Sequence, residues 1–201
     1  MNLTIRIEKE EDHFKTENLI RETFWDVYKP GCVEHLLLHQ LRKSEAFLPE
    51  LDLVACNNDE IVGNIVYSKA VIKNDTAENV VLCMGPLSVL PSYQNKGIGA
   101  LLLRTTIEKA KELGYKAVVI FGNPDYYHKF GFRNAKEYHI QTSEGQNFDA
   151  FMVLDLHHDG LSDIYGKFFE DKAFQIDEDA LAEFELMFPY KEKHKREGQL
   201  E

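Results

Sequence analysis

The sequence has few cysteines and no long apolar run. Its 201 residues include three cysteines, Cys32, Cys56 and Cys83, and no two of them have the C-x-x-C spacing typical of zinc or redox motifs. We therefore expect three reduced, buried thiols in a cytoplasmic protein. No window approaches the apolar length that crosses a bilayer, and the first residues lack the basic and apolar regions of a secretion signal. Neither a membrane span nor export is expected.

Positive charge is also scarce. Twenty-three Lys and Arg residues stand against 34 Asp and Glu residues, which gives a formal net charge of −11. Such a surface repels nucleic acid and anionic membranes at long range, so we expect neither as a partner. Cationic partners such as amines are mildly favoured.

Hydrophobic periodicity predicts alternating strands and helices over the first three quarters of the chain. The apolar runs 51–56 and 61–72 flank a polar turn and predict a hairpin. Gly85-Pro86 interrupts the run 80–90, so that strand should bulge or lose a partner there. The order predicts an α/β sheet of mixed direction, with strands at 3–8, 51–56, 61–72, 80–90, 117–121, near 132–140 and near 148–156. Helices are predicted at 11–28, at 32–43, after the glycines near residue 99 as far as about Leu113, and as a short helix within 124–130.

The character of the chain changes after His157. We expect a main domain at 1–157 and an acidic C-terminal extension at 158–201. A short helix near 177–188 should place Leu181, Phe184 and Phe188 on one apolar side, docked on the same chain or on a partner chain. The last residues should be frayed.

The stretch PSYQNKGIGALLL, from Pro91 to Leu103, places two glycines between a polar loop and a helix. A helix N-terminus presents free amides and a positive dipole end, and glycines let a phosphate approach them. A P-loop is excluded because Lys96 precedes Gly97, and a dinucleotide fingerprint is excluded because Leu102 stands at its third glycine position. The remaining pattern is Q-x-x-G-x-G, from Gln94 to Gly99.

That loop resembles the pyrophosphate motif of the GNAT superfamily of acetyl-CoA-dependent N-acetyltransferases. The run PLSVLP precedes it, a leucine-rich helix and the strand AVVIF follow, and YYHKFGF (126–132) resembles the family's FYxKxGF segment. GNPDYYHKFGF looks like the segment of small bacterial members that carry a D/N-P-x-Y-Y stretch. The resemblance covers roughly residues 1–157.

The resemblance implies a mixed, mostly antiparallel twisted sheet of six to seven strands, flanked by helices and split by a V-shaped acyl-CoA cleft. The backbone of Leu87, Ser88 and Val89 would pair with the pantetheine arm. The pyrophosphate would lie on the loop and the start of the helix, with Asn123 and Tyr126 touching the CoA arm. The loop residues are Gln94, Asn95, Lys96, Gly97, Ile98, Gly99 and Ala100, of which Lys96 is the best placed compensating charge.

The implied activity is transfer of an acetyl group from acetyl-CoA to a primary amine in a ternary complex. Tyr127 falls at the family's acid position and would stabilise the departing thiolate. Its pKa near 10, against about 8.5 for a thiol, makes complete proton transfer uphill by about 2 kcal/mol. No acid in the sequence can be assigned as the general base. The alternative is a non-catalytic acyl-CoA-binding sensor or interaction module.

Several residues allow two interpretations. His35 and His39 could bind one metal ion together. The residues between them include no glutamate, unlike the H-E-x-x-H motif, so we favour two surface histidines that bind no metal. Trp25, with Phe24 and Tyr28, could line an acceptor pocket or pack in the core. His128 could be a local base, although exposure is favoured. The acceptor amine stays undetermined, and a homodimer stays open.

Overall fold

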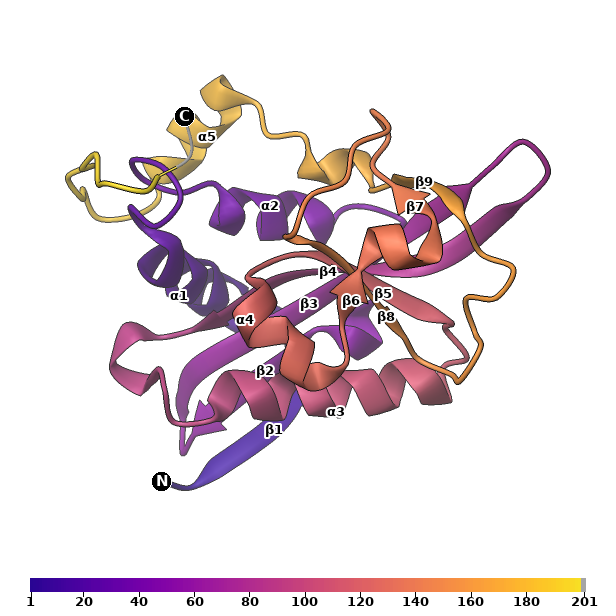
Figure 1. The fold of residues 1–201 in the computed structure, drawn as a ribbon. Helices are drawn as coiled ribbons and strands as arrows, with labels where there is room; N and C mark the ends of the chain where they lie inside the picture. Colours follow the sequence, from indigo (N-terminus) through magenta and orange to yellow (C-terminus); the bar gives the residue numbers. More distant parts are fainter. Residues whose placement is uncertain (200–201) are drawn as a thin grey trace. The chain divides into compact units, whose positions relative to one another are not determined.

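The computed structural model describes residues 1–199. Strands and helices alternate along the chain, as Figure 1 shows. The elements are β1 (Leu3–Ile7), α1 (His13–Phe24), α2 (Glu34–Leu41), β2 (Leu53–Asn57), β3 (Glu60–Lys73), β4 (Glu78–Val89), α3 (Ile98–Glu112), β5 (Ala117–Phe121), α4 (Pro124–Tyr127), β6 (Arg133–Asn134), β7 (Ile140–Gln141), β8 (Phe151–Asp155), β9 (Gly166–Phe169) and α5 (Glu178–Glu185).

The predicted fold class, a mixed α/β sheet that is mostly antiparallel, is confirmed. The strands follow the order β1-β2-β3-β4-β5-β8-β6, and β9 pairs with both β3 and β7. The nine strands exceed the predicted six to seven because β6 and β7 are two-residue strands and β9 had no clear sequence pattern. The predicted hairpin is present, with Asn57 of β2 paired to Glu60 of β3.

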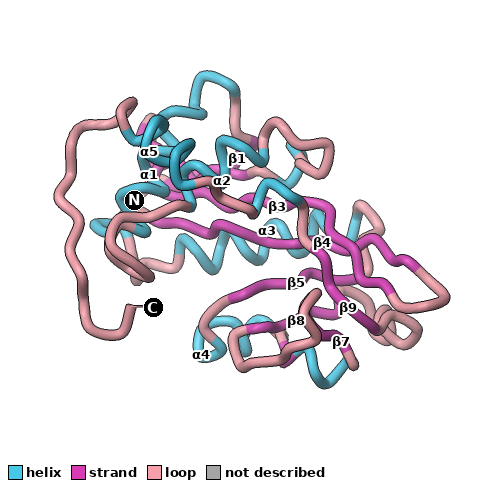
Figure 2. The backbone as a smooth tube through the Cα atoms, turned by 90° about the horizontal axis from the view of Figure 1, so that it is seen from above, coloured by secondary structure: helices cyan, strands magenta, loops and turns pink. Residues whose placement is uncertain are grey.

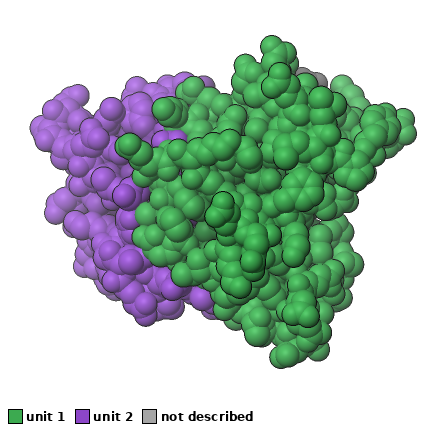
Figure 3. Space-filling view, turned by 180° about the vertical axis from the view of Figure 1, so that it is seen from behind, with its two compact units in different colours: residues 1–66, 86–102, 172–201 green, residues 67–85, 103–171 purple. Residues whose placement is uncertain are grey.

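The chain forms two compact units, coloured green and purple in Figure 3. Unit 1 comprises residues 1–66, 86–102 and the chain from Lys172 onward, and unit 2 comprises residues 67–85 and 103–171. The elements β3, β4 and α3 each contribute residues to both units.

Unit 1 is built around two helices packed on strands. Leu19 and Ile20 of α1 and Leu38 of α2 lie in one apolar cluster with Val54 of β2 and Val66 of β3. In α2, Leu36 and Leu38 are buried together with Leu41, whereas Val33 and Leu37 are half-buried.

The first predicted helix ends earlier than its apolar spacing suggested. Residue Asp26 has a positive φ of 58°, its amide donates to the Gly31 carbonyl, and its carboxylate accepts from the Gly31 amide at 2.7 Å. This closed turn ends α1 at Phe24 and leaves Val27 and Tyr28 exposed. The predicted helix 11–28 is therefore too long at its C-terminal end.

Unit 2 has β5 at its centre. This strand pairs in parallel with β4 at Leu82 and Cys83 and antiparallel with β8 along its whole length. Four of its residues are fully buried, as expected for a strand covered on both faces. Figure 2 shows β5, β8, β9 and α4 of this unit in the tube view. The β4–β5 pairing ends before Gly85, whose φ of 145° suits glycine, so the predicted loss of a partner at Gly85-Pro86 is confirmed.

The C-terminal part of unit 1 packs against α1 and α2. In α5, which begins after the N-cap Asp177, Phe184 is buried against Leu36, and Phe188 beyond the helix joins the same cluster. Further on, the Trp25 indole donates to the Glu192 carbonyl at 2.9 Å. The prediction of frayed last residues is wrong as far as Gln199, whose side chain donates to the Asp26 carbonyl.

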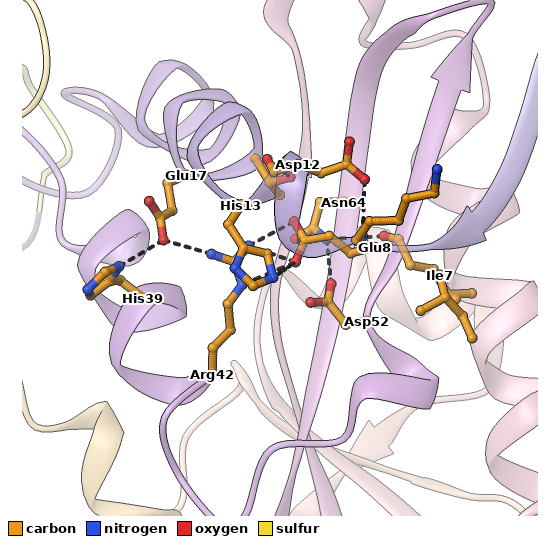
Figure 4. A network of polar contacts seen from close by, with 12 residues as sticks. Ile7, Glu8, Asp12, His13, Glu17, His39, Arg42, Asp52 and Asn64 are labelled. Atoms are coloured by element: carbon orange, nitrogen blue, oxygen red, sulfur yellow. Dashed lines mark hydrogen bonds and ion pairs between the residues drawn. The ribbon is translucent and has the colours of Figure 1, made fainter.

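Buried charges join three elements of unit 1 (Figure 4). Arg42 makes a forked contact with Glu8 at 2.7 and 2.8 Å and also reaches Glu17 at 2.7 Å. Burial raises the pKa of Asp52 well above its ordinary value, and its hydrogen bond to Glu8 adds to this shift. The network ties the end of β1 to α1 and α2.

Candidate active site

The loop before α3 is anchored to the β2–β3 hairpin of unit 1. The Tyr93 hydroxyl donates to Glu60 Oε2 at 2.6 Å and accepts from the Asn57 side chain at 3.3 Å. The Leu90 amide donates to the Val62 carbonyl at 3.0 Å. These bonds hold both the end of β4 and the loop that carries the spaced glycines.

Close packing sets where α3 begins. A β-carbon at Gly63 of β3 would lie 3.1 Å from the Leu102 side chain and from the Ser88 carbonyl, and 3.2 Å from the Ile98 side chain. Glycine at this position therefore lets the first turn of α3 approach the strands. Ile98 and Leu102 are buried there.

Free backbone amides gather at the start of α3. The first amides of a helix have no partner within the helix. Within residues 1–199, no backbone carbonyl accepts from the amides of residues 95–100. Both Asn95 and Gly97 have positive φ, 59° and 82°, and nothing lies within 4 Å of a β-carbon at Gly97. This loop is an open cradle of donors at the positive end of a 15-residue helix.

The side chains of the loop are partly engaged by the protein itself. Gln94 donates to the Val89 carbonyl at 3.1 Å, and Lys96 donates to the Ser92 carbonyl at 2.8 Å. The Lys96 ammonium also lies 5.0 Å from the centre of the Tyr93 ring. In this conformation Lys96 stabilises the loop, so it would have to leave Ser92 to meet a phosphate.

The end of β4 presents alternating buried and half-buried residues. Ser88 is buried, and its hydroxyl lies 3.5 Å from the Asn64 carbonyl, whereas Leu87 and Val89 are half-buried. The Val89 carbonyl also accepts from the Thr23 hydroxyl at 3.2 Å, besides Gln94. Sequence reasoning missed Thr23, since nothing marks a helical threonine as the partner of a distant strand end.

Unit 2 holds Asn123, Tyr126 and Tyr127 in and before the short helix α4. Asn123 is its N-cap, and its side-chain oxygen accepts from the Asp125 amide at 2.9 Å. This bond and Pro124 start the helix directly after β5. The N-cap bond occupies one oxygen of Asn123 and leaves its NH2 group for other partners.

The Tyr127 ring is held between aromatic neighbours and a glycine. Tyr126 and Phe132 lie edge-on to it, with ring centres at 5.0 and 5.5 Å. A β-carbon at Gly122 would come within 2.8 Å of its Cδ2 atom. Sequence reasoning missed Gly122, although a glycine next to Asn-Pro was a signal of close approach. Burial raises the pKa of Tyr67, and Tyr127 adds to that shift, so the two phenols are neighbours.

The favoured surface position is wrong for His35, which is buried, and the alternative metal site is not formed either. His35 Nε2 lies 2.6 Å from Glu185 Oε1, and His39 Nδ1 lies 2.9 Å from Glu17 Oε1, so the two histidines have different partners. Among residues 1–199 no cluster of three His, Cys, Asp or Glu side chains could hold a metal ion. No helix within this range is long and apolar enough to cross a membrane.

The structure also decides between the two interpretations of Trp25 and of His128. Trp25 is buried, with the Arg21 guanidinium 4.3 Å from its ring centre, so the core-packing interpretation is confirmed for this residue. His128 is exposed, as favoured.

Comparisons with known proteins find an acetyltransferase domain model and several relatives that match this chain. A sequence model described as an acetyltransferase (GNAT) domain matches residues 49–134. YjhQ of Escherichia coli K12, named an uncharacterized N-acetyltransferase, is 33% identical over 48% of this chain, and the chain spans about half of that relative, 53%. YhbS of the same strain, also named an uncharacterized N-acetyltransferase, is 29% identical over 82% of this chain and 93% of its own length.

Two solved structures share the fold. The structure of Escherichia coli YhbS in complex with CoA superposes with a TM-score of 0.77 and 26% identity, over 88% of this chain and 93% of that one. A GNAT family acetyltransferase of Brucella melitensis, in complex with acetyl-CoA, has a TM-score of 0.69 and 26% identity, over 86% of this chain and 98% of that one. Residues 49–134 of this chain therefore match a GNAT acetyltransferase domain, and the chain shares its fold with GNAT family structures.

Proposed function

We propose that this protein transfers an acetyl group from acetyl-CoA to a primary amine. The observation that carries the proposal is the open cradle of amides at residues 95–100, which lies within the part of the chain that matches the acetyltransferase domain. The structural relatives were solved with CoA or acetyl-CoA, which supports the same cofactor here.

The cofactor would be held mostly by backbone. The amides of residues 94–100, including Gln94, bind the pyrophosphate, since they lie at the start of a helix and those of residues 95–100 donate to no backbone carbonyl within residues 1–199. The pantetheine arm pairs with the backbone of Leu87, Ser88 and Val89, much like an added strand. Asn123, through its free NH2 group, and Tyr126 contact the CoA arm.

The chemistry is direct acyl transfer. The amine nitrogen attacks the thioester carbonyl, a backbone amide near Leu87 or Val89 polarises that carbonyl, and the C–S bond breaks to release the CoA thiolate. Removing a proton from an amine of pKa near 10.4 at about pH 7.4 costs roughly 4 kcal/mol, so the proton must pass to a base or a water. Tyr127 donates a hydrogen bond to the thiolate as it forms.

Location and assembly complete the proposal. The three cysteines are free and buried, which supports a reducing, cytoplasmic setting.

Leu186 and Tyr190 are the apolar residues most exposed near α5 and are the surface on which a homodimer would form. Sedimentation of wild-type protein beside a Leu186→Glu, Tyr190→Glu variant tests that assembly.

The function is tested by a matched pair of glycine substitutions. Gly97→Glu and Gly114→Glu change the two ends of α3, at the same φ of 82° and with the same free space around the β-carbon. We expect only Gly97→Glu to abolish calorimetric binding of acetyl-CoA, because its carboxylate occupies the proposed phosphate position. Equal affinity in the two folded variants would reject the phosphate site. A panel of amines, assayed for acetyl-CoA consumption, then tests the transfer itself.

A further inference from the structure

The last described residues of unit 1 form a basic segment that lies on the same unit. Residues 191–199, called the basic strap below, contain three lysines, a histidine and an arginine, although the chain as a whole has a net charge of −11. No part of the strap is a helix or a strand. Figure 1 shows it in yellow beside the loop that follows α1. The strap therefore concentrates positive charge on one small part of an acidic protein.

Ion pairs with two acids of α1 and its following turn hold the strap. The Lys191 ammonium lies 2.7 Å from Glu22 Oε2. His194 Nδ1 lies 3.2 Å from Asp26 Oδ2, and the Arg196 guanidinium lies 3.9 Å from the same oxygen. The Asp26 side chain is only 1% exposed. A carboxylate that is buried in this way depends on its donors and cations, and the strap supplies part of them.

The main chain of the strap and of the residues before it is also recognised. The Trp25 indole donates to the Glu192 carbonyl at 2.9 Å, and the Arg21 guanidinium donates to the Pro189 carbonyl at 3.2 Å. The Lys191 ammonium lies 5.4 Å from the centre of the Trp25 ring, within the range of a cation–π contact. Part of the burial of Trp25 is thus due to the strap. Donors for carbonyls, beside acids and an aromatic ring for lysine, are a combination that fits a basic peptide.

A glycine makes room for a second lysine of the strap. A β-carbon at Gly31 would lie 3.0 Å from Lys193 Cε and 3.1 Å from its Cδ. The apolar stem of Lys193 therefore lies directly on the turn, as long cationic side chains do when their stem is covered and their ammonium reaches water. The surface accommodates two lysines that are two residues apart.

The same part of α1 touches the strand that is proposed to bind the pantetheine arm. The Thr23 hydroxyl lies 3.2 Å from the Val89 carbonyl. Glu22, which pairs with the strap, belongs to the same helical turn as Thr23. A peptide seated where the strap lies would therefore bring its lysines to the turn of α1 that contacts the proposed cofactor strand.

We infer that Glu22, Trp25 and Asp26 form a peptide-binding surface, that the acceptor bound there is a lysine-bearing basic peptide, and that the basic strap is an internal occupant which blocks it. Strap and acceptor exclude each other, so a docked strap lowers the rate of transfer. In the reaction, the lysine nitrogen bonds to the acetyl carbon, the C–S bond of acetyl-CoA breaks, and the amine proton leaves through water. The inference rests on the proposed acetyl transfer and names its substrate class and its regulation.

The fluorescence of Trp25 reports whether the strap is docked, because Trp25 is the only tryptophan and bonds to the strap. The double variant Lys191→Glu, His194→Gln removes both close pairs and sets a carboxylate against Glu22. Lys195→Glu is the matched control, since it makes the same change in net charge at a residue that forms no ion pair within residues 1–199. We expect the released fraction of the strap to rise about 10-fold in the double variant alone, measured as increased acrylamide quenching.

A synthetic peptide with the sequence of residues 189–199 and a blocked N-terminus tests the surface as a separate molecule. Calorimetry on the CoA-bound double variant measures its binding, and quenching of Trp25 measures whether it covers the ring. We expect the peptide to bind and to lower the quenching. Spermidine, a polyamine without main-chain carbonyls, should do neither. With the peptide as acceptor, kcat/KM from acetyl-CoA consumption should be about 10-fold higher in the double variant than in the wild type.

The inference is overturned if the double variant and Lys195→Glu show equal quenching, if the peptide does not bind, or if spermidine covers Trp25 as well as the peptide does. It is also overturned if transfer to the peptide is no faster in the double variant than in the wild type. Acetyl transfer to some other amine would leave the proposed function standing in each of these cases. Loss of acetyl-CoA binding together with a lack of transfer to every amine would reject the proposed function itself.

Discussion

Gly122 and Tyr127 are in a contact that leaves no room for a methyl group. A β-carbon at position 122 would lie 2.8 Å from Tyr127 Cδ2 and closer still to Cε2. The backbone at Gly122 does not have the positive φ that would itself demand glycine. The ring of Tyr127 is therefore the reason that this position holds glycine, and the contact fixes where the phenol points.

Gly122→Ala is expected to move the Tyr127 ring. Without the contact, alanine at this φ would be neutral or would stabilise the fold by about 0.4–1 kcal/mol through the unfolded state. With the contact, the ring must shift, and misplacement of a catalytic group lowers kcat by about 10- to 100-fold. Steady-state kinetics should show this loss with little change in acetyl-CoA affinity.

Gly114→Ala serves as the control for that substitution. Gly114 has a positive φ of 82° and open space around it, so alanine there costs about 1 kcal/mol of stability without touching Tyr127. If both variants keep the wild-type kcat, the position of the Tyr127 ring does not matter for the reaction.

Tyr127→Phe tests the hydroxyl itself. The thiolate exists only once the C–S bond begins to break, so loss of a hydrogen bond to it acts on the transition state. We expect kcat to fall about 10²-fold while acetyl-CoA affinity stays nearly the same. An unchanged kcat would point to Tyr126 or a water instead. Loss of CoA binding would place Tyr127 in the cofactor site and leave the catalytic role without support.

Short sequence patterns predicted those helices, strands and turns that depend on residues close together in the chain. The hairpin at Asn57–Glu60, the continuous apolar strand β5 and the helix after Gly97 each follow from turn residues or hydrophobic periodicity, and each is present. The proposed cofactor loop could be found because binding a phosphate needs glycine and a helix start within a few residues. Functional roles that depend on such short-range patterns can be predicted from the sequence without knowledge of the fold.

Contacts between segments that lie far apart in the sequence could not be predicted from it. The short strand β9 has no alternating pattern and exists because Phe169 pairs with Val71 of β3. The charged C-terminal residues read as frayed, yet Lys191 reaches Glu22 at 2.7 Å.

Docking of α5 should contribute measurably to the stability of unit 1. Phe184 is buried and packs on the rings of His35, His39 and Phe188, whereas nearby Leu186 is 85% exposed. Phe184→Ala should lower the free energy of unfolding by about 3–5 kcal/mol, and Leu186→Ala by less than about 0.5 kcal/mol. Urea unfolding measures both. Equal, small losses would mean that α5 is not part of the cooperative unit.

A second contact holds the same helix. Arg21, buried in α1, makes a forked ion pair with Glu185, 164 residues away, at 2.9–3.2 Å. The Glu185 carboxylate also lies 2.6 Å from His35 Nε2, and the Cys32 sulfur lies 3.4 Å from His35 Nδ1. His35 is therefore enclosed by an acid, a thiol and the Arg21 cation, with Lys193 adding positive charge.

This enclosure predicts that stability falls in mild acid. Burial, opposed by Glu185 and assisted by Arg21, lowers the pKa of His35 from 6.5 to about 4. Between pH 6.5 and pH 4 the folded state thus binds fewer protons than the unfolded state. The free energy of unfolding is therefore at its full value, as far as His35 is concerned, above about pH 6.5, and it decreases as the pH falls toward 4. Titration of His35 lowers the free energy of unfolding by about 3 kcal/mol over this range, and the lowered pKa of Glu185 acts in the same direction.

His35→Gln removes this titration, whereas His157→Gln changes an exposed histidine and is the control. We compare the free energy of urea unfolding at pH 7 and pH 4.5 for wild type and both variants. The wild type and His157→Gln should lose clearly more stability over this range than His35→Gln, because only they retain a histidine that must gain a proton on unfolding. If His35→Gln shows the same dependence on pH as the control, the acid sensitivity arises from other groups, and burial of neutral His35 does not contribute to it.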